Sequence, residues 1–115
     1  MTFRIELPLV PSLNNAYATN RKTGRRFLTR QAANWKEEAQ WIIGVFHRGR
    51  FTGPYRLTIL LPEKMRGDVD NRAKLASDIL VSMGVTPDDS KAVETTCRRD
   101  ASVAAGKCVV VVEAA

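Results

Sequence analysis

The sequence predicts an α+β fold of mixed α/β character, in which a mixed β-sheet of about four strands packs against two helices. Three observations lead to this prediction. Short stretches alternate apolar and polar residues, as strands do, and two longer stretches repeat apolar residues at helical spacing. The length of 115 residues favours one domain, spanning residues 1–115, and no repeat or linker divides it.

The first expected element is a strand over residues 3–9. Phe3, Ile5 and Leu7 alternate there with charged residues, which is typical of a half-buried strand. Prolines stop the pattern, and residues 11–15 predict a turn held by local side-chain hydrogen bonds.

A basic segment and a helix should follow. Residues 18–28 are polar and basic around Gly24, which predicts a mobile loop or a short hairpin. Thr29 is expected to be the N-cap of a helix that Gly49 can end. The apolar stripe of this helix comprises Ala32, Trp35, Ala39, Ile42, Ile43 and Phe46.

The second half of the chain predicts a central strand and another helix. Residues 55–61 carry apolar side chains on both faces, which favours a strand covered on both sides, and Pro62 ends it. A helix is expected from Asp70, as its N-cap, to Gly84. Its apolar face comprises Leu75, Ile79, Leu80 and Met83.

Two further strands are expected over residues 91–98 and 108–112. The small and polar residues 100–106 between them predict a hairpin loop that joins the two strands.

The charge balance favours a polyanionic partner. The formal net charge is +6 and the isoelectric point is about 9.8. Five cations lie within ten residues that contain no acid: Arg21, Lys22, Arg25, Arg26 and Arg30. We expect these side chains to follow DNA phosphates, and we expect Phe27 among them to pack into the core.

Cysteine use and hydropathy narrow the class of protein. Cys97, Cys108 and His47 are too few to form a four-ligand zinc site, so the cysteines are expected to be reduced core or strand residues, and His47 to lie at a helix end. No apolar run reaches the ~20 residues of a membrane span, and no secretion signal is visible, which together favour a cytoplasmic location.

Acidic residues around the second helix predict a metal site. Asp68 and Asp70 stand directly before this helix, Lys74 follows one turn in, and Asp88 and Asp89 come after the turn at Pro87. Carboxylates, waters and phosphate oxygens are the ligands that Mg²⁺ prefers. Magnesium held in this way can activate phosphodiester displacement, and the lysine can bind a phosphate oxygen or place the attacking water.

Simpler structural roles remain open for the same residues. Asp70 can be only a helix cap, residues 88–90 only a turn, and Lys74 an exposed ion pair with Asp70 or Asp78. A calcium-binding loop is disfavoured, because Arg72 occupies the third ligand position and the required Gly and Glu are missing.

The spacing of these residues resembles a known family. Asp68-Val-Asp70-Asn71-x-x-Lys74, then Asp78, Gly84-Val85 and Asp88-Asp89-Ser90, closely resemble the RusA family of Holliday-junction resolvases, and Pro11-Ser12-x-Asn14-x-x-Tyr17 is similar to its N-terminal signature. The chain departs from many members at Thr86-Pro87 and at Gly67. Neither departure removes a catalytic group, but both bear on DNA contacts and on sequence preference.

The resemblance implies a bacterial or phage-encoded, homodimeric, Mg²⁺-dependent endonuclease that acts on four-way junction DNA in recombination and repair. It implies that Asp68, Asp70 and Asp89 are catalytic metal ligands and that Lys74 is the catalytic lysine. The expected DNA contacts are Asn14, Arg21, Lys22, Arg25, Arg26, Arg66 and Arg72.

Two other classes of function remain open on sequence grounds. One is a DNA-binding module without catalytic activity, which would bind phosphate through charge and a helix N-terminus. The other is a small metal-dependent phosphoesterase. The basic segment argues against the phosphoesterase, because a small substrate needs no such extended charge.

Overall fold

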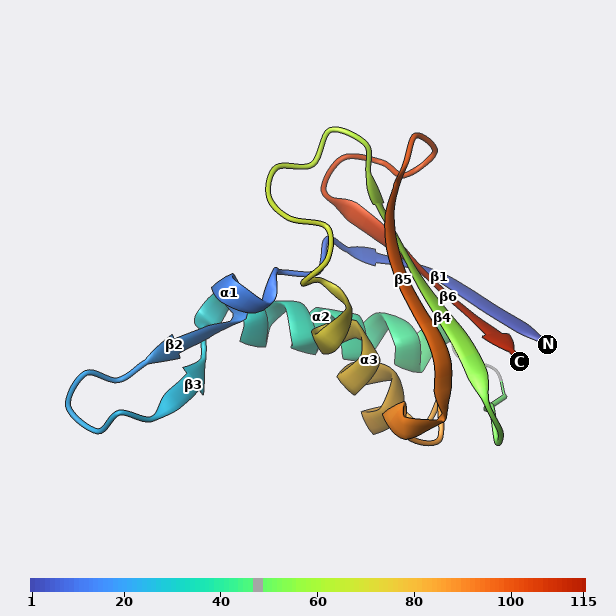
Figure 1. Cartoon of the computed structure of the whole chain (residues 1–115), viewed down its shortest axis with the longest axis horizontal. Coiled ribbons are helices and arrows are strands. Elements are labelled where there is room, and N and C mark those ends of the chain that lie inside the picture. The colour runs from blue at the N-terminus through green and yellow to red at the C-terminus, as the bar shows by residue number, and fades with distance from the viewer. Residues whose placement is uncertain (47–48) are drawn as a thin grey trace.

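The computed structural model describes residues 1–46 and 49–115 and has an α+β fold, as expected. One sheet of mixed direction has the strand order β1-β6-β4-β5 (Figure 1). Its strands are β1 (Thr2–Pro8), β4 (Tyr55–Pro62), β5 (Ala92–Asp100) and β6 (Lys107–Ala114). A second sheet consists of β2 (Tyr17–Thr19) and β3 (Arg26–Leu28). Of the two structures expected for the basic segment, a mobile loop or a short hairpin, the segment forms the hairpin.

The connection between β5 and β6 differs from the expected hairpin. β6 lies between β1 and β4 and is antiparallel to both, while β5 pairs in parallel with the other side of β4. The physical reason is burial. Residues 108–112 are buried on both faces of β6, as a central strand requires, whereas β5 carries charged and hydroxyl side chains that suit an edge.

Two longer helices lie against one face of this sheet (Figure 1). They are α2 (Arg30–Phe46) and α3 (Ala73–Ser82), and the two packed helices of the sequence prediction are thus confirmed. The Trp35 Nε1–H donates to the Pro8 carbonyl at 2.7 Å and ties α2 to the end of β1. Helix α3 connects the parallel strands β4 and β5.

Two short helical turns complete the chain. The expected turn after β1 forms α1 (Leu13–Ala16), where the Ser12 hydroxyl accepts a hydrogen bond from the Asn15 N–H at 3.3 Å. A 3₁₀ turn, η1 (Asp89–Lys91), precedes β5.

The ends of α2 agree only in part with the sequence. The Thr29 hydroxyl accepts from the Ala32 N–H at 3.3 Å, which confirms the expected cap. Phe46 was expected in the buried stripe but is 65% exposed, because the buried members of that stripe end at Ile43. The prediction for His47 lies outside the described residues.

The core confirms the expected place of residues 55–61. The side chains of Leu57, Ile59 and Leu61 belong to the main cluster beneath the helices, while Leu60 packs with three valines on the other face of the sheet. Both cysteines are free thiols, as expected, and burial raises the pKa of Cys108 to about 11.

Candidate active site

The loop between β4 and α3 carries Asp68 and Asp70, and a charged side chain from β5 holds it in place. The Arg99 Nη1 donates to the Met65 carbonyl at 2.6 Å and to the Glu63 carbonyl at 3.1 Å, while Nη2 donates to the Gly67 carbonyl at 3.1 Å. One guanidinium therefore fixes three backbone oxygens of the loop. Sequence reasoning missed Arg99, because its position on a polar strand looks like that of an ordinary exposed charge.

A second arginine holds the loop from inside. Arg72 is 8% exposed, and its guanidinium donates to the Val10 carbonyl at 2.8 Å, the Asp68 carbonyl at 3.1 Å and the Arg66 carbonyl at 3.2 Å. Burial, followed by the charge of Arg99, lowers the pKa of Arg72. The expectation that Arg72 contacts DNA therefore needs correction, because this side chain is buried and fully engaged with the protein's own backbone.

Gly67 makes this arrangement possible. Its φ of +93° lies in the left-handed region that favours glycine. A Cβ added here would lie 2.9 Å from the Arg72 Nη2, so a side chain would displace the guanidinium. Nearby, the Leu13 N–H donates to the Asn71 carbonyl at 2.9 Å and attaches α1 to the same loop.

Asp70 is not the helix cap that the sequence predicts. Helix α3 begins at Ala73, and Arg72 occupies the cap position without a side-chain hydrogen bond to the helix. The turn at residues 70–72 places Asp70 too far from the first helical N–H groups. Its exposed side chain lines a cavity of about 410 Å³. The other lining residues are Leu13, Asn71, Ala73, Lys74, Ser77 and Thr95.

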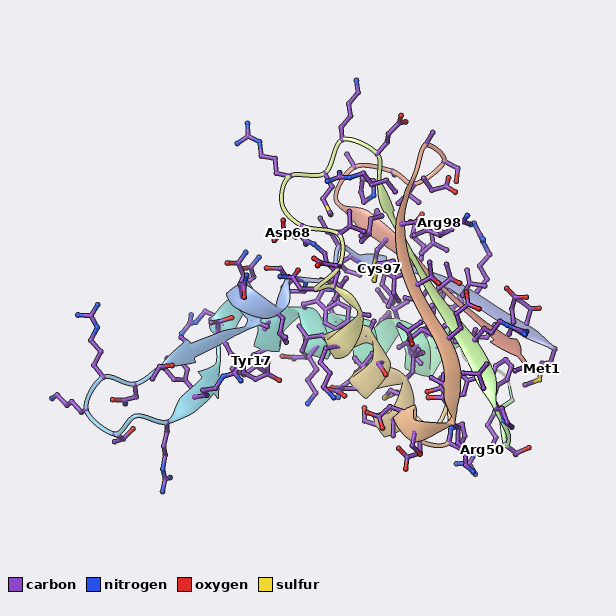
Figure 2. All side chains as sticks on the ribbon, in the orientation of Figure 1. Met1, Tyr17, Arg50, Asp68, Cys97 and Arg98 are labelled. Carbon is purple, nitrogen blue, oxygen red and sulfur yellow. The ribbon has the colours of Figure 1, made fainter. Side chains whose placement is uncertain are left out.

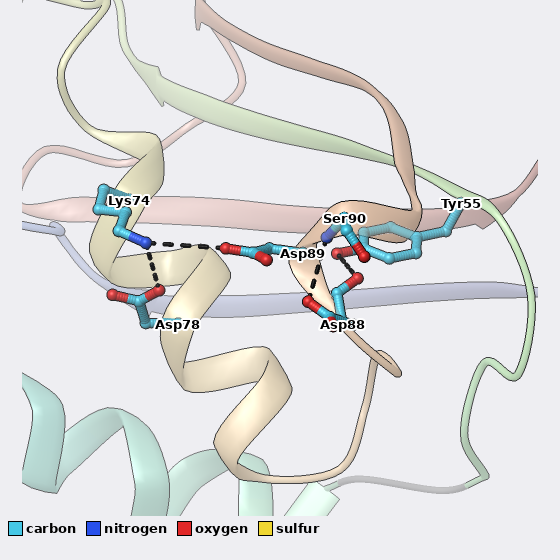
Figure 3. A network of polar contacts seen from close by, with 6 residues as sticks. All are labelled: Tyr55, Lys74, Asp78, Asp88, Asp89 and Ser90. Carbon is cyan, nitrogen blue, oxygen red and sulfur yellow. Dashed lines mark hydrogen bonds and ion pairs between the residues drawn. The ribbon is translucent and has the colours of Figure 1, made fainter.

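Lys74 joins this cavity to the 3₁₀ turn (Figure 3). Its ammonium lies 2.9 Å from the Asp78 Oδ1 and 3.7 Å from the Asp89 Oδ2. The hydrogen bond and charge of Asp78, with a smaller contribution from Asp89, raise the pKa of Lys74. The expected pairing with Asp78 is thus present, and Asp89 is brought to the same cation from a distant part of the sequence.

The turn that presents Asp89 is itself anchored. The Asp88 carboxylate accepts from the Ser90 N–H at 3.2 Å, and the Tyr55 hydroxyl donates to the Asp88 carbonyl at 3.2 Å (Figure 3). The backbone hydrogen bond from Ser90, followed by a side-chain hydrogen bond with Asp89, lowers the pKa of Asp88. Burial raises the pKa of Tyr55, which keeps this hydroxyl a donor. Asp88 therefore has a structural role, and Asp89 points to Lys74.

The three expected metal ligands do not form a closed cluster. Within residues 1–46 and 49–115, no three His, Cys, Asp or Glu side chains converge on a point suited to a metal ion. Asp68, Asp70 and Asp89 are all exposed. Asp70 lines the same cavity as Lys74, and Asp89 forms an ion pair with Lys74. These oxygen donors suit Mg²⁺, which needs only one or two carboxylates when waters and phosphates complete its shell.

The expected DNA contacts extend outward from this centre. The hairpin projects away from the sheet, with Tyr17 at its base (Figure 2). Arg21, Lys22 and Arg25 are exposed near its tip, where the Asn20 side-chain oxygen accepts from the Lys22 N–H at 2.9 Å. The remaining exposed candidates are Asn14 on α1, Arg26 on β3 and Arg66 on the β4–α3 loop.

Phe27 corrects one expectation about this hairpin. Its side chain is 50% exposed instead of packed into the core, because a two-stranded hairpin that projects into solvent offers no core to its outer face. On the neighbouring residue, the Arg26 guanidinium carbon lies 4.7 Å from the centre of the Tyr17 ring.

None of the helices in the described part of the chain combines the length and apolar character needed to cross a bilayer.

Comparison with known proteins identifies the family. A search of curated proteins finds no match. The family model described as endodeoxyribonuclease RusA matches residues 6–113, which include both parts of the site. With nearly its whole length matched, the chain belongs to the RusA family of endodeoxyribonucleases.

Proposed function

We propose that this protein is a Mg²⁺-dependent endonuclease that resolves Holliday junctions by paired phosphodiester hydrolysis. Membership of the RusA family supports a nuclease that acts on junction DNA. The observation that carries the assignment is the position of Lys74, which lines the Asp70 cavity and lies 3.7 Å from Asp89. Acidic groups and a cation thus meet at an exposed edge, where a phosphate can approach.

We propose Asp68, Asp70 and Asp89 as the residues that hold the metal. Their oxygens suit magnesium, and their exposure leaves room for water and for a DNA phosphate to complete the coordination. Bound magnesium would supply charge stabilisation and an activated water. Arg72 and Arg99 position the loop that carries two of these carboxylates. Arg72 donates to two backbone carbonyls of the loop and to that of Val10, and Arg99 donates to three further carbonyls of the loop.

Lys74 would bind the phosphate oxygens and offset the negative charge that grows during hydrolysis. The hydrogen bond and charge of Asp78, with the nearby charge of Asp89, raise the pKa of Lys74, so the ammonium stays protonated in the wall of the cavity. A preorganised cation of this kind acts mainly on the transition state.

The exposed cations would hold the arms of the junction. Arg21, Lys22 and Arg25 lie on the projecting hairpin, and Arg66 lies on the β4–α3 loop. A four-way junction has approximate two-fold symmetry, so we propose a homodimer whose two sites cut opposed strands. Such substrates arise in the bacterial cytoplasm, where chromosomal and phage DNA recombine, and we propose that the protein acts there in recombination and repair.

The test compares labelled four-way, duplex and single-stranded DNA with and without magnesium. We expect symmetric cuts in the four-way junction only when magnesium is present. Mixed dimers of wild-type and Asp70→Asn chains should nick one strand. Absence of magnesium-dependent cleavage from junctions that the protein binds would reject the nuclease assignment.

One observation favours a second candidate, a DNA-binding protein without catalytic activity. The three carboxylates are not gathered into a cluster among the described residues. The same assay separates the two functions, because a purely binding protein shifts the junction on a gel but leaves every strand intact.

A further inference from the structure

A second cavity, of about 520 Å³, lies between the hairpin and α3. It is lined by Leu13, Tyr17, Arg26, Phe27, Leu28 and Lys74. Two of these residues, Leu13 and Lys74, also line the cavity that contains Asp70. The two cavities are therefore neighbours with a common wall, and no carboxylate belongs to the lining of the second one.

One side of this cavity combines a cation with an aromatic ring. The strand register pairs Tyr17 with Leu28 and Thr19 with Arg26, which puts Tyr17, Leu28 and Arg26 on one face of the hairpin. The Arg26 guanidinium carbon lies 4.7 Å from the centre of the Tyr17 ring. This contact restrains a planar cation on an aromatic ring, and guanidinium planes and aromatic rings are the surfaces on which proteins stack unpaired bases.

We propose that this cavity binds one unpaired nucleobase of the DNA, next to the phosphate that is cleaved. The base would stack on the Arg26–Tyr17 pair and contact Leu13 and Leu28, while Lys74 in the common wall binds the adjoining phosphate. This base pocket rests on the proposed nuclease function, since that function places the phosphate at Lys74.

The chemistry of the cavity favours a nucleotide over a bare phosphate or an acidic peptide. A phosphate alone would leave the aromatic and leucine walls unused, and an acidic peptide would gain nothing from a flat stacking surface. A base inside a duplex already has both faces stacked. A base at the branch point of a junction is the one most easily unstacked, so the pocket also gives a reason for preference for branched DNA.

The experiment uses the full chain with Asp70→Asn, magnesium, and a four-way junction that carries the fluorescent base 2-aminopurine at the branch point. The emission of 2-aminopurine responds to stacking, so binding should change it. Adding Arg26→Lys keeps the charge but removes the planar guanidinium. We expect the fluorescence change to disappear and the affinity to fall about five-fold or more, in line with the loss of one stacked base.

The matched control is Arg4→Lys in the same Asp70→Asn chain, because Arg4 is an exposed arginine on β1, outside both cavities. It should keep both the fluorescence change and the affinity. A second pair varies the ring beneath the arginine: Tyr17→Phe should preserve the response, and Tyr17→Leu should abolish it.

Several results would overturn the base pocket. The first is that Arg26→Lys behaves like Arg4→Lys in both readouts. The second is a fall in affinity with an unchanged fluorescence response, which would indicate a phosphate contact alone. Failure of the nuclease assignment is a separate outcome. If the wild-type protein cleaves no junction but the response depends on Arg26 and Tyr17 as described, the pocket stands and the nuclease function does not.

Discussion

The Lys74 ammonium lies 3.7 Å from the Asp89 Oδ2, so a residue in the first turn of α3 meets a residue that precedes β5. The same ammonium donates to the Asp78 Oδ1 at 2.9 Å. Both ion pairs are about half exposed, and exposed pairs contribute little to stability. The two ion pairs of Lys74 therefore contribute little to the stability of the fold.

Lys74→Met should reduce the single-turnover rate of junction cleavage by ~10²-fold or more, as removal of one preorganised electrostatic group does. The free energy of unfolding should fall by only ~0.3–0.5 kcal/mol, the contribution of an exposed helical pair. Single-turnover cleavage at saturating protein measures chemistry apart from binding, and urea denaturation measures stability.

The matched control for Lys74 is Asp78→Asn. It removes the 2.9 Å partner but leaves the ammonium beside Asp89. Cleavage close to the wild-type rate is expected. If Lys74→Met also cleaves at this rate, Lys74 is only a partner in a surface ion pair, and the carboxylate assignment is unaffected.

Asp70→Asn should nearly abolish cleavage and leave junction binding intact or stronger, because a negative charge near the phosphates is lost. Stability should change little, since Asp70 does not cap α3. Gel-shift and cleavage assays on the same preparation test both parts. Full magnesium-dependent cleavage by the pure variant would exclude Asp70 as a metal ligand.

Arg72→Lys should lower the free energy of unfolding by about 2 kcal/mol or more. A lysine cannot reach all three carbonyls that the guanidinium binds, and a buried acceptor left without a donor costs ~1–3 kcal/mol. Cleavage should fall as well, because the loop that carries Asp68 loses its support. Urea denaturation measures the effect.

The exposed Arg66 provides the control for this loss of stability. Arg66→Lys should unfold at the same urea concentration as the wild type. Equal stability of Arg72→Lys and Arg66→Lys would mean that the buried contacts of Arg72 are not needed to hold the loop.

Replacing Arg21, Lys22 and Arg25 together by Ala should weaken junction binding most at low salt. Each phosphate contact that is lost should reduce the log–log slope of affinity against salt by roughly 1. The fold should persist, because the three side chains are exposed near the hairpin tip. A slope equal to that of the wild type would show that the tip remains in solvent when DNA binds.

The sequence predicted those parts of the structure that depend on residues close together in the chain. The alternation of Phe3, Ile5 and Leu7 reflects one buried face of a strand, and the burial of residues 55–61 on both faces marks an interior strand. The Thr29 cap was predictable for the same reason, because a cap acts within one turn of its helix.

The parts that sequence did not predict depend on contacts between distant segments. Arg72 looks like a surface charge until the Val10 carbonyl, 62 residues away, is brought next to it. The place of β6 depends on competition among strands for the centre of the sheet, which favours its valine run over the polar β5. Phe27 was expected in the core, but it lies on a hairpin that projects into solvent. Asp70 was expected to cap α3, but the helix begins three residues later.

The insertion of β6 between β1 and β4 has a consequence for how the protein is made. Thr2 pairs with Glu113, so the sheet joins the two extremes of the described chain. During translation, β4, α3 and β5 leave the ribosome before β6 exists to join β4 to β1. Pairing over such sequence distances is also slow. A nascent chain therefore carries Asp68, Asp70 and Asp89 before the sheet beside them can close.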